Sequence, residues 1–259
     1  MTTVADNGFL NVLAMDTGLK GKSVLVTEAG TSLGRSLALA FAGEGANLVL
    51  GSLKATDALY ETEREALALG VKVVSSPFNL ETEDRVRRFV QKGLDKYGNI
   101  DVLLNNVGAT GPVQSFEQMS FEAWREAIQL QLTGSLFLCR AVLPGMVERR
   151  WGRVIHCVGL EGFLGGNPAR SAVQMGLVGL ARGTTTQYGK YNITVNCVGS
   201  AGVEGSENSD SYVSAKVNDP LGRQGKLREI SSAAVYLASE DAGYITGQCY
   251  LVNGGKVFL

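Results

Sequence analysis

Four polar residues in the second half of the chain have the types and spacing that could do chemistry. His156, Cys157 and Glu161 lie close together in sequence, and a base, a thiol nucleophile and a carboxylate could support a redox-neutral reaction. Adjacent residues of a strand point to opposite faces, however, and a cysteine in a buried strand usually serves packing. Arg170 could bind an anionic group such as a carboxylate or a CoA phosphate, although an arginine at a helix start is more often solvated. A redox-neutral enzyme and a ligand-sensing protein therefore stay open as alternatives.

The cysteines and the single histidine do not predict a metal site. Cys139, Cys157, Cys197 and Cys249 lie far apart with no C-x-x-C spacing. Together with one histidine they match no familiar zinc pattern, so we expect no bound metal. We interpret them as reduced and mostly buried cysteines, which indicates a cytoplasmic protein.

The charge balance and the apolar pattern exclude several partners. The chain has 24 basic and 25 acidic residues, a net charge of −1, and no basic run that could follow a phosphate backbone or an anionic bilayer. No apolar run approaches the roughly 20 residues that a membrane span requires. The first residues lack the basic stretch of a secretory signal. We therefore expect neither nucleic acid nor a membrane as a partner.

Strand and helix patterns alternate along most of the chain. Strands are predicted at 22–27, 47–50, 71–75, 101–106, 153–157, 192–197 and 249–252. Helices are predicted at 33–43, 55–69, 124–148, 172–188 and 230–239, with one more that ends near residue 96. Such alternation predicts an α/β fold, a single Rossmann-type doubly wound parallel sheet with helices on both faces. A chain of 259 residues fits one such domain, at 20–259, after an N-terminal leader at 1–19. The polar stretch 199–219 is a candidate lid.

Several motifs occur in a fixed order. They are Asn105-Asn106-Val107-Gly108, Gly152-Arg153-Val154-Ile155, Asp219-Pro220-Leu221-Gly222-Arg223, Tyr244-Ile245-Thr246-Gly247-Gln248 and Val252-Asn253-Gly254-Gly255. With these motifs the chain resembles the classical short-chain dehydrogenase/reductase family over about residues 20 to 256. The resemblance implies a nicotinamide-binding fold and, in complete members, a catalytic tetrad of Asn, Ser, Tyr and Lys.

The glycine-rich turn of that family is altered here. The pattern T-G-x-x-x-G-x-G falls on Thr27–Gly34, where Glu28 and Ser32 replace two glycines. The glycines let backbone N–H groups approach the pyrophosphate, whereas a carboxylate about 4 Å away repels it by roughly 1 kcal/mol in water and roughly 4 kcal/mol at an effective dielectric near 20. In the alternative interpretation, Glu28 turns into solvent and Gly30 supplies the turn in a shifted register.

Two further positions agree with weak cofactor binding. After the second strand the chain reads Gly51-Ser52-Leu53, without the acid or arginine that would contact the ribose. After the third strand Asn79 stands where the family usually has an aspartate for the adenine, although an asparagine could still accept a hydrogen bond. With Glu28, Ser32 and Asn79 as degenerate positions, we expect no cofactor on this chain.

The four tetrad positions also carry other residue types in this chain. The resemblance places the family's Asn, Ser, Tyr and Lys on Gln131, Gly159, Arg170 and Gln174, and no tyrosine or lysine occurs anywhere from Gly162 to Gln187. An arginine does not release a proton near neutral pH, and a glutamine supplies no charge that could lower a neighbour's pKa. The sequence therefore predicts no catalytic residue for hydride transfer.

The remaining family features are those of assembly. Members usually form dimers and tetramers through the long helices, here at about 124–148 and 172–188, and through the C-terminal strand. Val173, Leu177, Leu180 and Ala181 follow the spacing of an apolar stripe, which could face a partner or the sheet.

These observations favour a non-catalytic subunit in a heterodimer or heterotetramer with a catalytically complete short-chain dehydrogenase paralogue that binds NAD. The pairing is similar to that of hydroxyacyl-CoA dehydrogenases of anaerobic aromatic degradation, such as the (hydroxybenzyl)succinyl-CoA dehydrogenase of toluene degradation.

Overall fold

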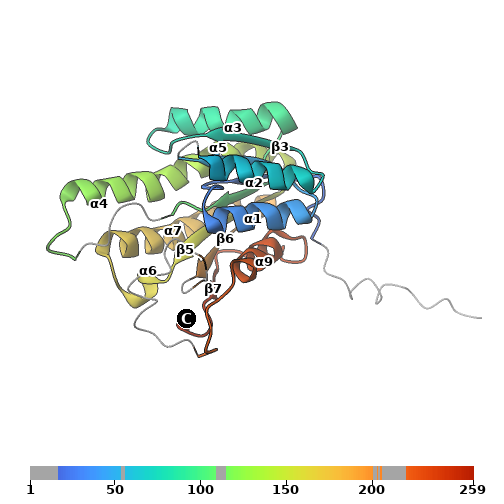
Figure 1. The fold of residues 1–259 in the computed structure, drawn as a ribbon. Coiled ribbons are helices and arrows are strands. Elements are labelled where there is room, and N and C mark those ends of the chain that lie inside the picture. The colour runs from blue at the N-terminus through green and yellow to red at the C-terminus, as the bar shows by residue number, and fades with distance from the viewer. Residues whose placement is uncertain (1–16, 54–55, 109–114, 201–202, 204, 206–219) are drawn as a thin grey trace, which may run out of the picture.

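A computed structural model describes residues 17–53, 56–108, 115–200, 203, 205 and 220–259. Within these residues, seven parallel strands form one sheet in the order β3-β2-β1-β4-β5-β6-β7 (Figure 1). The strands are β1 (Ser23–Val26), β2 (Asn47–Ser52), β3 (Val73–Pro77), β4 (Val102–Asn105), β5 (Gly152–Gly159), β6 (Ile193–Ser200) and β7 (Cys249–Val252). The strand order reverses between β1 and β4, so the crevice that binds ligands in doubly wound folds lies at their carboxyl ends.

Helices cover both faces of this sheet. They are α1 (Ser32–Gly43), α2 (Asp57–Ala68), α3 (Glu83–Tyr97), α4 (Phe121–Ala127), η2 (Ile128–Thr133), α5 (Gly134–Arg149), α6 (Glu161–Leu164), α7 (Pro168–Tyr188), η3 (Gly189–Tyr191) and α9 (Leu227–Ala238). One hydrophobic cluster, called here the first cluster, joins the sheet to α3, α5 and α7. The second cluster joins the other face to α1, α2 and α9. The predicted doubly wound Rossmann-type fold is therefore confirmed.

Local caps explain why some elements begin or end elsewhere than the apolar pattern predicts. The hydroxyl of Ser120 caps α4, so this helix begins at Phe121 instead of near residue 124. Asn167 caps α7, with Pro168 in its first turn, so α7 begins four residues before the predicted start at residue 172. The third strand runs from Val73 to Pro77 instead of from 71 to 75, because its pairing with β2 begins at Leu48 with Val73 and ends at Ser52 with Pro77.

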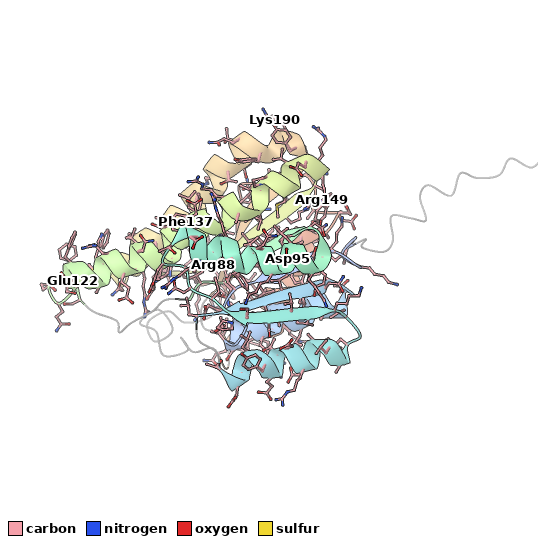
Figure 2. All side chains as sticks on the ribbon, turned by 90° about the horizontal axis from the view of Figure 1, so that it is seen from above. Arg88, Asp95, Glu122, Phe137, Arg149 and Lys190 are labelled. Carbon is pink, nitrogen blue, oxygen red and sulfur yellow. The ribbon has the colours of Figure 1, made fainter. Side chains whose placement is uncertain are left out.

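The segments α4, η2 and α5 form one long helix, from Phe121 to Arg149, whose N-terminal part projects beyond the sheet (Figures 1 and 2). This helix is long and apolar enough to cross a membrane by length and composition, which the sequence pattern did not predict. Leu138, Val142 and Met146 nevertheless pack in the first cluster. The apolar character of α5 is thus that of a helix packed on the sheet.

The apolar stripe of α7 faces the sheet. Val173, Leu177 and Ala181 are buried in the first cluster, and Leu180 packs against it. Of the two directions that the sequence left open, the structure therefore supports core packing. The exposed positions of this helix include Met175, which has 42% of its surface exposed.

The first described residues pack against the domain. Leu19 is fully buried in the second cluster, and the Thr17 hydroxyl donates to the Glu44 carboxylate at 3.0 Å. Residues 1–16 of the predicted leader lie outside the described residues. The same holds for most of the candidate lid at 199–219, of which Gly199 and Ser200 end β6.

Candidate functional site

The turn between β1 and α1 carries the first altered cofactor position. Glu28 itself adopts a left-handed φ of 51°, at a cost of about 1 kcal/mol for a residue with a Cβ. Its side chain turns toward the end of β2, where the Leu53 N–H donates to Glu28 Oε1 at 2.9 Å. Burial raises the pKa of Glu28 above its ordinary value, while the hydrogen bonds from Leu53 and Ser52 act in the opposite direction. The alternative with Glu28 in solvent and Gly30 as the turn residue is wrong, because Gly30 does not adopt a positive φ.

Further contacts close this turn onto β2 and α2. The Ala29 N–H donates to the Gly51 carbonyl at 2.9 Å, and the Thr62 hydroxyl donates to the Ala29 carbonyl at 2.9 Å. A Cβ on Gly30 would lie 3.2 Å from Thr56 Oγ1. The segment that approaches a pyrophosphate in the family is thus bonded to its own neighbours.

The framework around the turn is preserved. A Cβ on Gly34 would lie 2.0 Å from the Glu28 carbonyl oxygen, so this third glycine is needed for the close approach of α1 to the turn. The Thr31 hydroxyl accepts the Gly34 N–H and caps α1. Asn106 donates its N–H to Thr27 Oγ1 at 2.8 Å and its amide to Thr31 Oγ1 at 3.3 Å, which ties β4 to the turn.

The other two degenerate cofactor positions serve local structure. Ser32 is the first residue of α1, directly after the Thr31 cap. Asn79 Oδ1 accepts the Glu81 N–H at 2.7 Å and so stabilises the turn after β3.

Gln131, at the family's Asn position, lies in the π-helical segment η2 and is buried. Its backbone carbonyl accepts the Ser135 hydroxyl, and Asn105 Nδ2 lies 2.6 Å from Ser135 Oγ and 2.9 Å from His156 Nδ1. These four residues form a buried polar chain from η2 through α5 and β4 to β5. Among the described residues, Gln131 Nε2 and His156 Nε2 have no hydrogen-bond partner. This chain was not predicted from the sequence, although the spacing of Gln131 and Ser135 by one helical turn was a usable signal.

Gly159, Arg170 and Gln174, which the resemblance assigns to the family's Ser, Tyr and Lys positions, lie close together around Glu161. Gln174 Oε1 accepts the Gly162 N–H at 2.8 Å, and Gln174 Nε2 lies 3.4 Å from Glu161 Oε2. Arg170 Nη1 lies 3.6 Å from Glu161 Oε1, and both side chains are at most 10% exposed. A Cβ on Gly159 would lie 2.7 Å from Gln174 Nε2, so the glutamine amide occupies the space that a serine side chain would need.

The expectation of a solvated Arg170 is therefore wrong, because Glu161 holds the guanidinium in the interior. Burial raises the pKa of Glu161, while the charge of Arg170 and the hydrogen bond from Gln174 act in the opposite direction. Glu161 thus pairs with the arginine and is not an isolated base.

His156 and Cys157 point to opposite faces, which confirms the argument against a shared pocket. His156 contacts Asn105 on the side of the first cluster, and burial lowers its pKa to about 4. Cys157 packs against the second cluster. Part of this residue is exposed, but its thiol is buried, and the burial raises the pKa of the thiol to about 12. Neither group is ionised near neutral pH.

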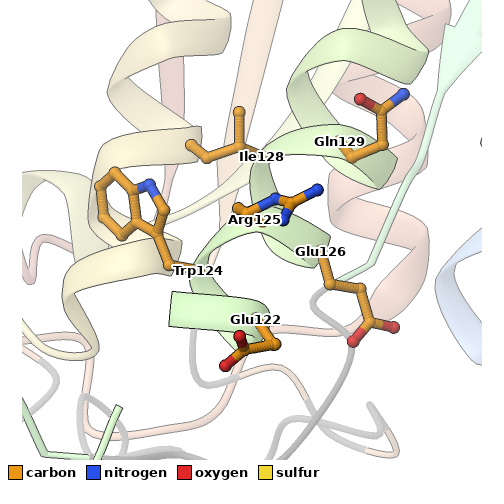
Figure 3. A pocket seen from close by; sticks show the side chains of 6 residues that line it. All are labelled: Glu122, Trp124, Arg125, Glu126, Ile128 and Gln129. Atoms are coloured by element: carbon orange, nitrogen blue, oxygen red, sulfur yellow. The ribbon is translucent and has the colours of Figure 1, made fainter. Parts of the chain in front are cut away.

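An open pocket lies elsewhere, on the projecting helix. It is lined by Glu122, Trp124, Arg125, Glu126, Ile128 and Gln129 (Figure 3). The described lining residues come from consecutive turns of one helix, with charged side chains around Trp124 and Ile128. Within the described residues, no group of three or more His, Cys, Asp or Glu side chains is placed to hold a metal ion.

The fold and the position of the crevice are those of the doubly wound, Rossmann-type domains. Comparisons with known proteins identify the family within this class. Residues 29–256 match the family described as enoyl-(acyl carrier protein) reductase. The 3-oxoacyl-[acyl-carrier-protein] reductase FabG of Thermotoga maritima is 31% identical, over 92% of this chain and 99% of that protein. Nodulation protein G of Rhizobium sp. strain N33 is 32% identical, over 93% of this chain and 99% of that protein.

Solved structures agree with the sequence relatives. A crystal structure of levodione reductase superposes with a TM-score of 0.84 at 27% identity and covers 92% of this chain and 98% of its own. The chain belongs to the classical short-chain dehydrogenase/reductase family.

Proposed function

We propose that this chain is a non-catalytic subunit of a hetero-oligomeric, NAD-dependent short-chain dehydrogenase. The observation that carries the proposal is the buried network of Arg170, Glu161 and Gln174 at the positions of the family's proton-transfer groups. The arginine keeps its proton near neutral pH, and the glutamine amide is neutral. Gly159 offers no hydroxyl to hold a substrate oxygen. Hydride transfer would therefore occur on a catalytically complete paralogue.

The same proposal places NAD on the partner. Support comes from Glu28, whose carboxylate lies against the end of β2, and from the hydrogen bonds that close the β1–α1 turn onto β2 and α2. A dinucleotide pyrophosphate at this turn would approach a buried acid.

We propose that the partner binds to the long helix 121–149 and to α7, the helices through which members of this family usually assemble. Leu136 on α5 is 40% exposed and Met175 on α7 is 42% exposed. The pocket around Trp124 and Ile128 adds an apolar patch with a charged rim on the projecting part of the helix (Figure 3). Such a surface suits a protein interface better than an open solvent face.

For the partner we propose a 3-hydroxyacyl-CoA substrate, such as 2-(hydroxybenzyl)succinyl-CoA, and a cytoplasmic location. The names of the FabG relatives refer to an acyl chain with a 3-oxo group, and a 3-hydroxyacyl thioester is the alcohol of the same class.

Co-expression with a paralogue encoded next to this chain tests the proposal. We expect both chains to elute together in a stoichiometric complex that turns over substrate. Replacing the catalytic tyrosine of the paralogue should abolish this activity. Calorimetric titration of this chain alone with NAD(H) and NADP(H) should show no saturable binding. If this chain elutes separately from the paralogue, the result favours a redox-neutral enzyme or a ligand-sensing protein. Saturable micromolar binding of a dinucleotide to this chain alone would contradict the assignment of the cofactor to the partner.

A further inference from the structure

The sheet brings together two cysteines that are 52 residues apart in sequence. Cys197 on β6 and Cys249 on β7 are register partners in the parallel pairing of these strands. The Cys197 N–H donates to the Gln248 carbonyl at 2.8 Å, which fixes this register. Cα atoms of register partners on adjacent strands lie about 4.8 Å apart, within the range of about 4.4–6.8 Å that disulfides span.

Both thiols lie on the same face of the sheet. Cys197 is buried in the first cluster, and Cys249 packs against that cluster. A Cβ on Gly199, two residues after Cys197 and hence on the same face, would lie 3.8 Å from Cys249 Sγ. The two sulfur atoms are therefore neighbours across the strand pair.

The two thiols differ in access and in their surroundings. Cys197 is fully buried, and its Sγ lies 3.9 Å from the Leu177 carbonyl oxygen. Cys249 is partly exposed. The neighbouring Cys197 thiol and the more distant Arg182 guanidinium hold the pKa of Cys249 below its ordinary value, against the effect of burial. In contrast, burial raises the pKa of both Cys139 and Cys157 to about 12.

We propose that Cys249 and Cys197 are a peroxide-reactive thiol pair that closes a reversible disulfide between β7 and β6. The Cys249 thiolate attacks the peroxide, so that an S–O bond forms, the O–O bond breaks, and Cys249 becomes a sulfenic acid with release of hydroxide. The Cys197 sulfur then attacks the Cys249 sulfur, the S–O bond breaks, and the departing hydroxide takes the Cys197 proton as water. Two electrons pass from the thiol pair to the peroxide, which is reduced.

The bridge would be strained and easily reduced. Cβ atoms of register partners on parallel strands lie farther apart than the roughly 3.8 Å of a relaxed disulfide, so β7 must shift toward β6. Such strained disulfides are the ones that small thiols reverse. This site lies in the strand pair and not in the crevice, so its test on the purified chain does not depend on the proposed subunit role.

Peptide mapping tests the pair, because the four cysteines fall in four different tryptic peptides, 126–140, 154–170, 191–216 and 229–256. The folded full-length protein is treated with hydrogen peroxide, denatured and alkylated. We expect a linked pair of peptides 191–216 and 229–256, loss of two of the four alkylatable thiols, and recovery of both with dithiothreitol. Cys139 and Cys157 should stay alkylatable and serve as internal controls.

Single variants separate the two roles. In Cys197→Ser, Cys249 should accumulate as a sulfenic acid that dimedone traps, whereas in Cys249→Ser, Cys197 should stay reduced. Cys157→Ser is the matched control and should form the bridge like the unmodified protein. Cys249 should react about tenfold faster than Cys157 or more. Equal rates, a Cys249 bridge between two molecules, or oxidation of Cys249 without pairing would each overturn the proposal.

Discussion

His156 makes the stability of this protein depend on pH in a way that one substitution can isolate. The imidazole is fully buried between β5 and α5, and burial lowers its pKa from 6.5 to about 4. Below about pH 6.5 the unfolded chain therefore takes up a proton that the folded chain does not take up until about pH 4. Stability is complete above the unfolded pKa and falls as the pH drops through this window.

The size of the effect follows from the two pKa values. Between about pH 7.5 and about pH 5, the free energy of unfolding should fall by roughly 2 kcal/mol through this group alone. The raised pKa values of Glu28 and Glu161 act with the opposite sign, because their folded states hold protons more tightly as the pH falls. Their contribution is the same in a variant that changes only the histidine, so it cancels in the difference.

Urea unfolding of the unmodified protein and of His156→Asn at several pH values measures that difference. The unmodified protein should lose stability relative to the variant by about 2 kcal/mol on going to about pH 5. Low protein concentrations are needed because the sequence pI is about 6.0. The chain has one histidine, so its imidazole NMR signal can be assigned directly. Parallel stability curves, or an imidazole that titrates near 6.5 in the folded protein, would refute the reasoning.

Three further substitutions test the crevice. Glu28→Gly should raise the free energy of unfolding by about 1 kcal/mol near neutral pH, because it removes a partly buried carboxylate and a left-handed glutamate. The gain should shrink as the pH falls toward the ordinary glutamate pKa of 4.5, and thermal melts that give the same gain at neutral pH and at about pH 4.5 would contradict this. Arg170→Met should lower the free energy of unfolding by about 3 kcal/mol, because it leaves the Glu161 carboxylate buried without its ion partner. Adding Glu161→Gln in the same chain should recover part of this loss. If urea unfolding shows that the losses of the two single variants simply add in the double variant, the two side chains are not coupled. Gln174→Ala should lower the free energy of unfolding by about 1 kcal/mol more than the control Gln187→Ala, which lies on an exposed turn of α7. Equal melting temperatures of these two variants would contradict a stabilising role of the Gln174 hydrogen bonds.

The sequence was sufficient for the fold because its apolar strands and helical periods are local patterns. The strands around Val24, Leu103 and Val195 are continuously buried, as a parallel sheet requires. The flanking motifs also assign the expected tetrad positions to particular residues, and two of these residues, Gly159 and Gln174, lie side by side in the structure. Helix starts were placed less well, because caps such as Asn167 act before the apolar pattern begins.

The directions of the side chains in the crevice could not be predicted. Glu28 bonds to the Leu53 N–H only because β1 and β2 pair in parallel and bring both turns to one edge of the sheet. Arg170 is buried because Glu161 reaches it from α6, and nothing in a single helix pattern indicates that pairing. In both cases a long-range contact decides between solvent and interior.

The network in the crevice also determines what it would take to restore chemistry. Gly159→Ser alone would place a Cβ 2.7 Å from Gln174 Nε2, in the space that the amide fills. Gln174→Lys alone would remove the acceptor of the Gly162 N–H and bring a second cation to the carboxylate that already pairs with Arg170. Each replacement is thus supported by the others, so single reversions should destabilise the crevice without creating a proton path. The residues at these positions thus satisfy one another and form a packed network.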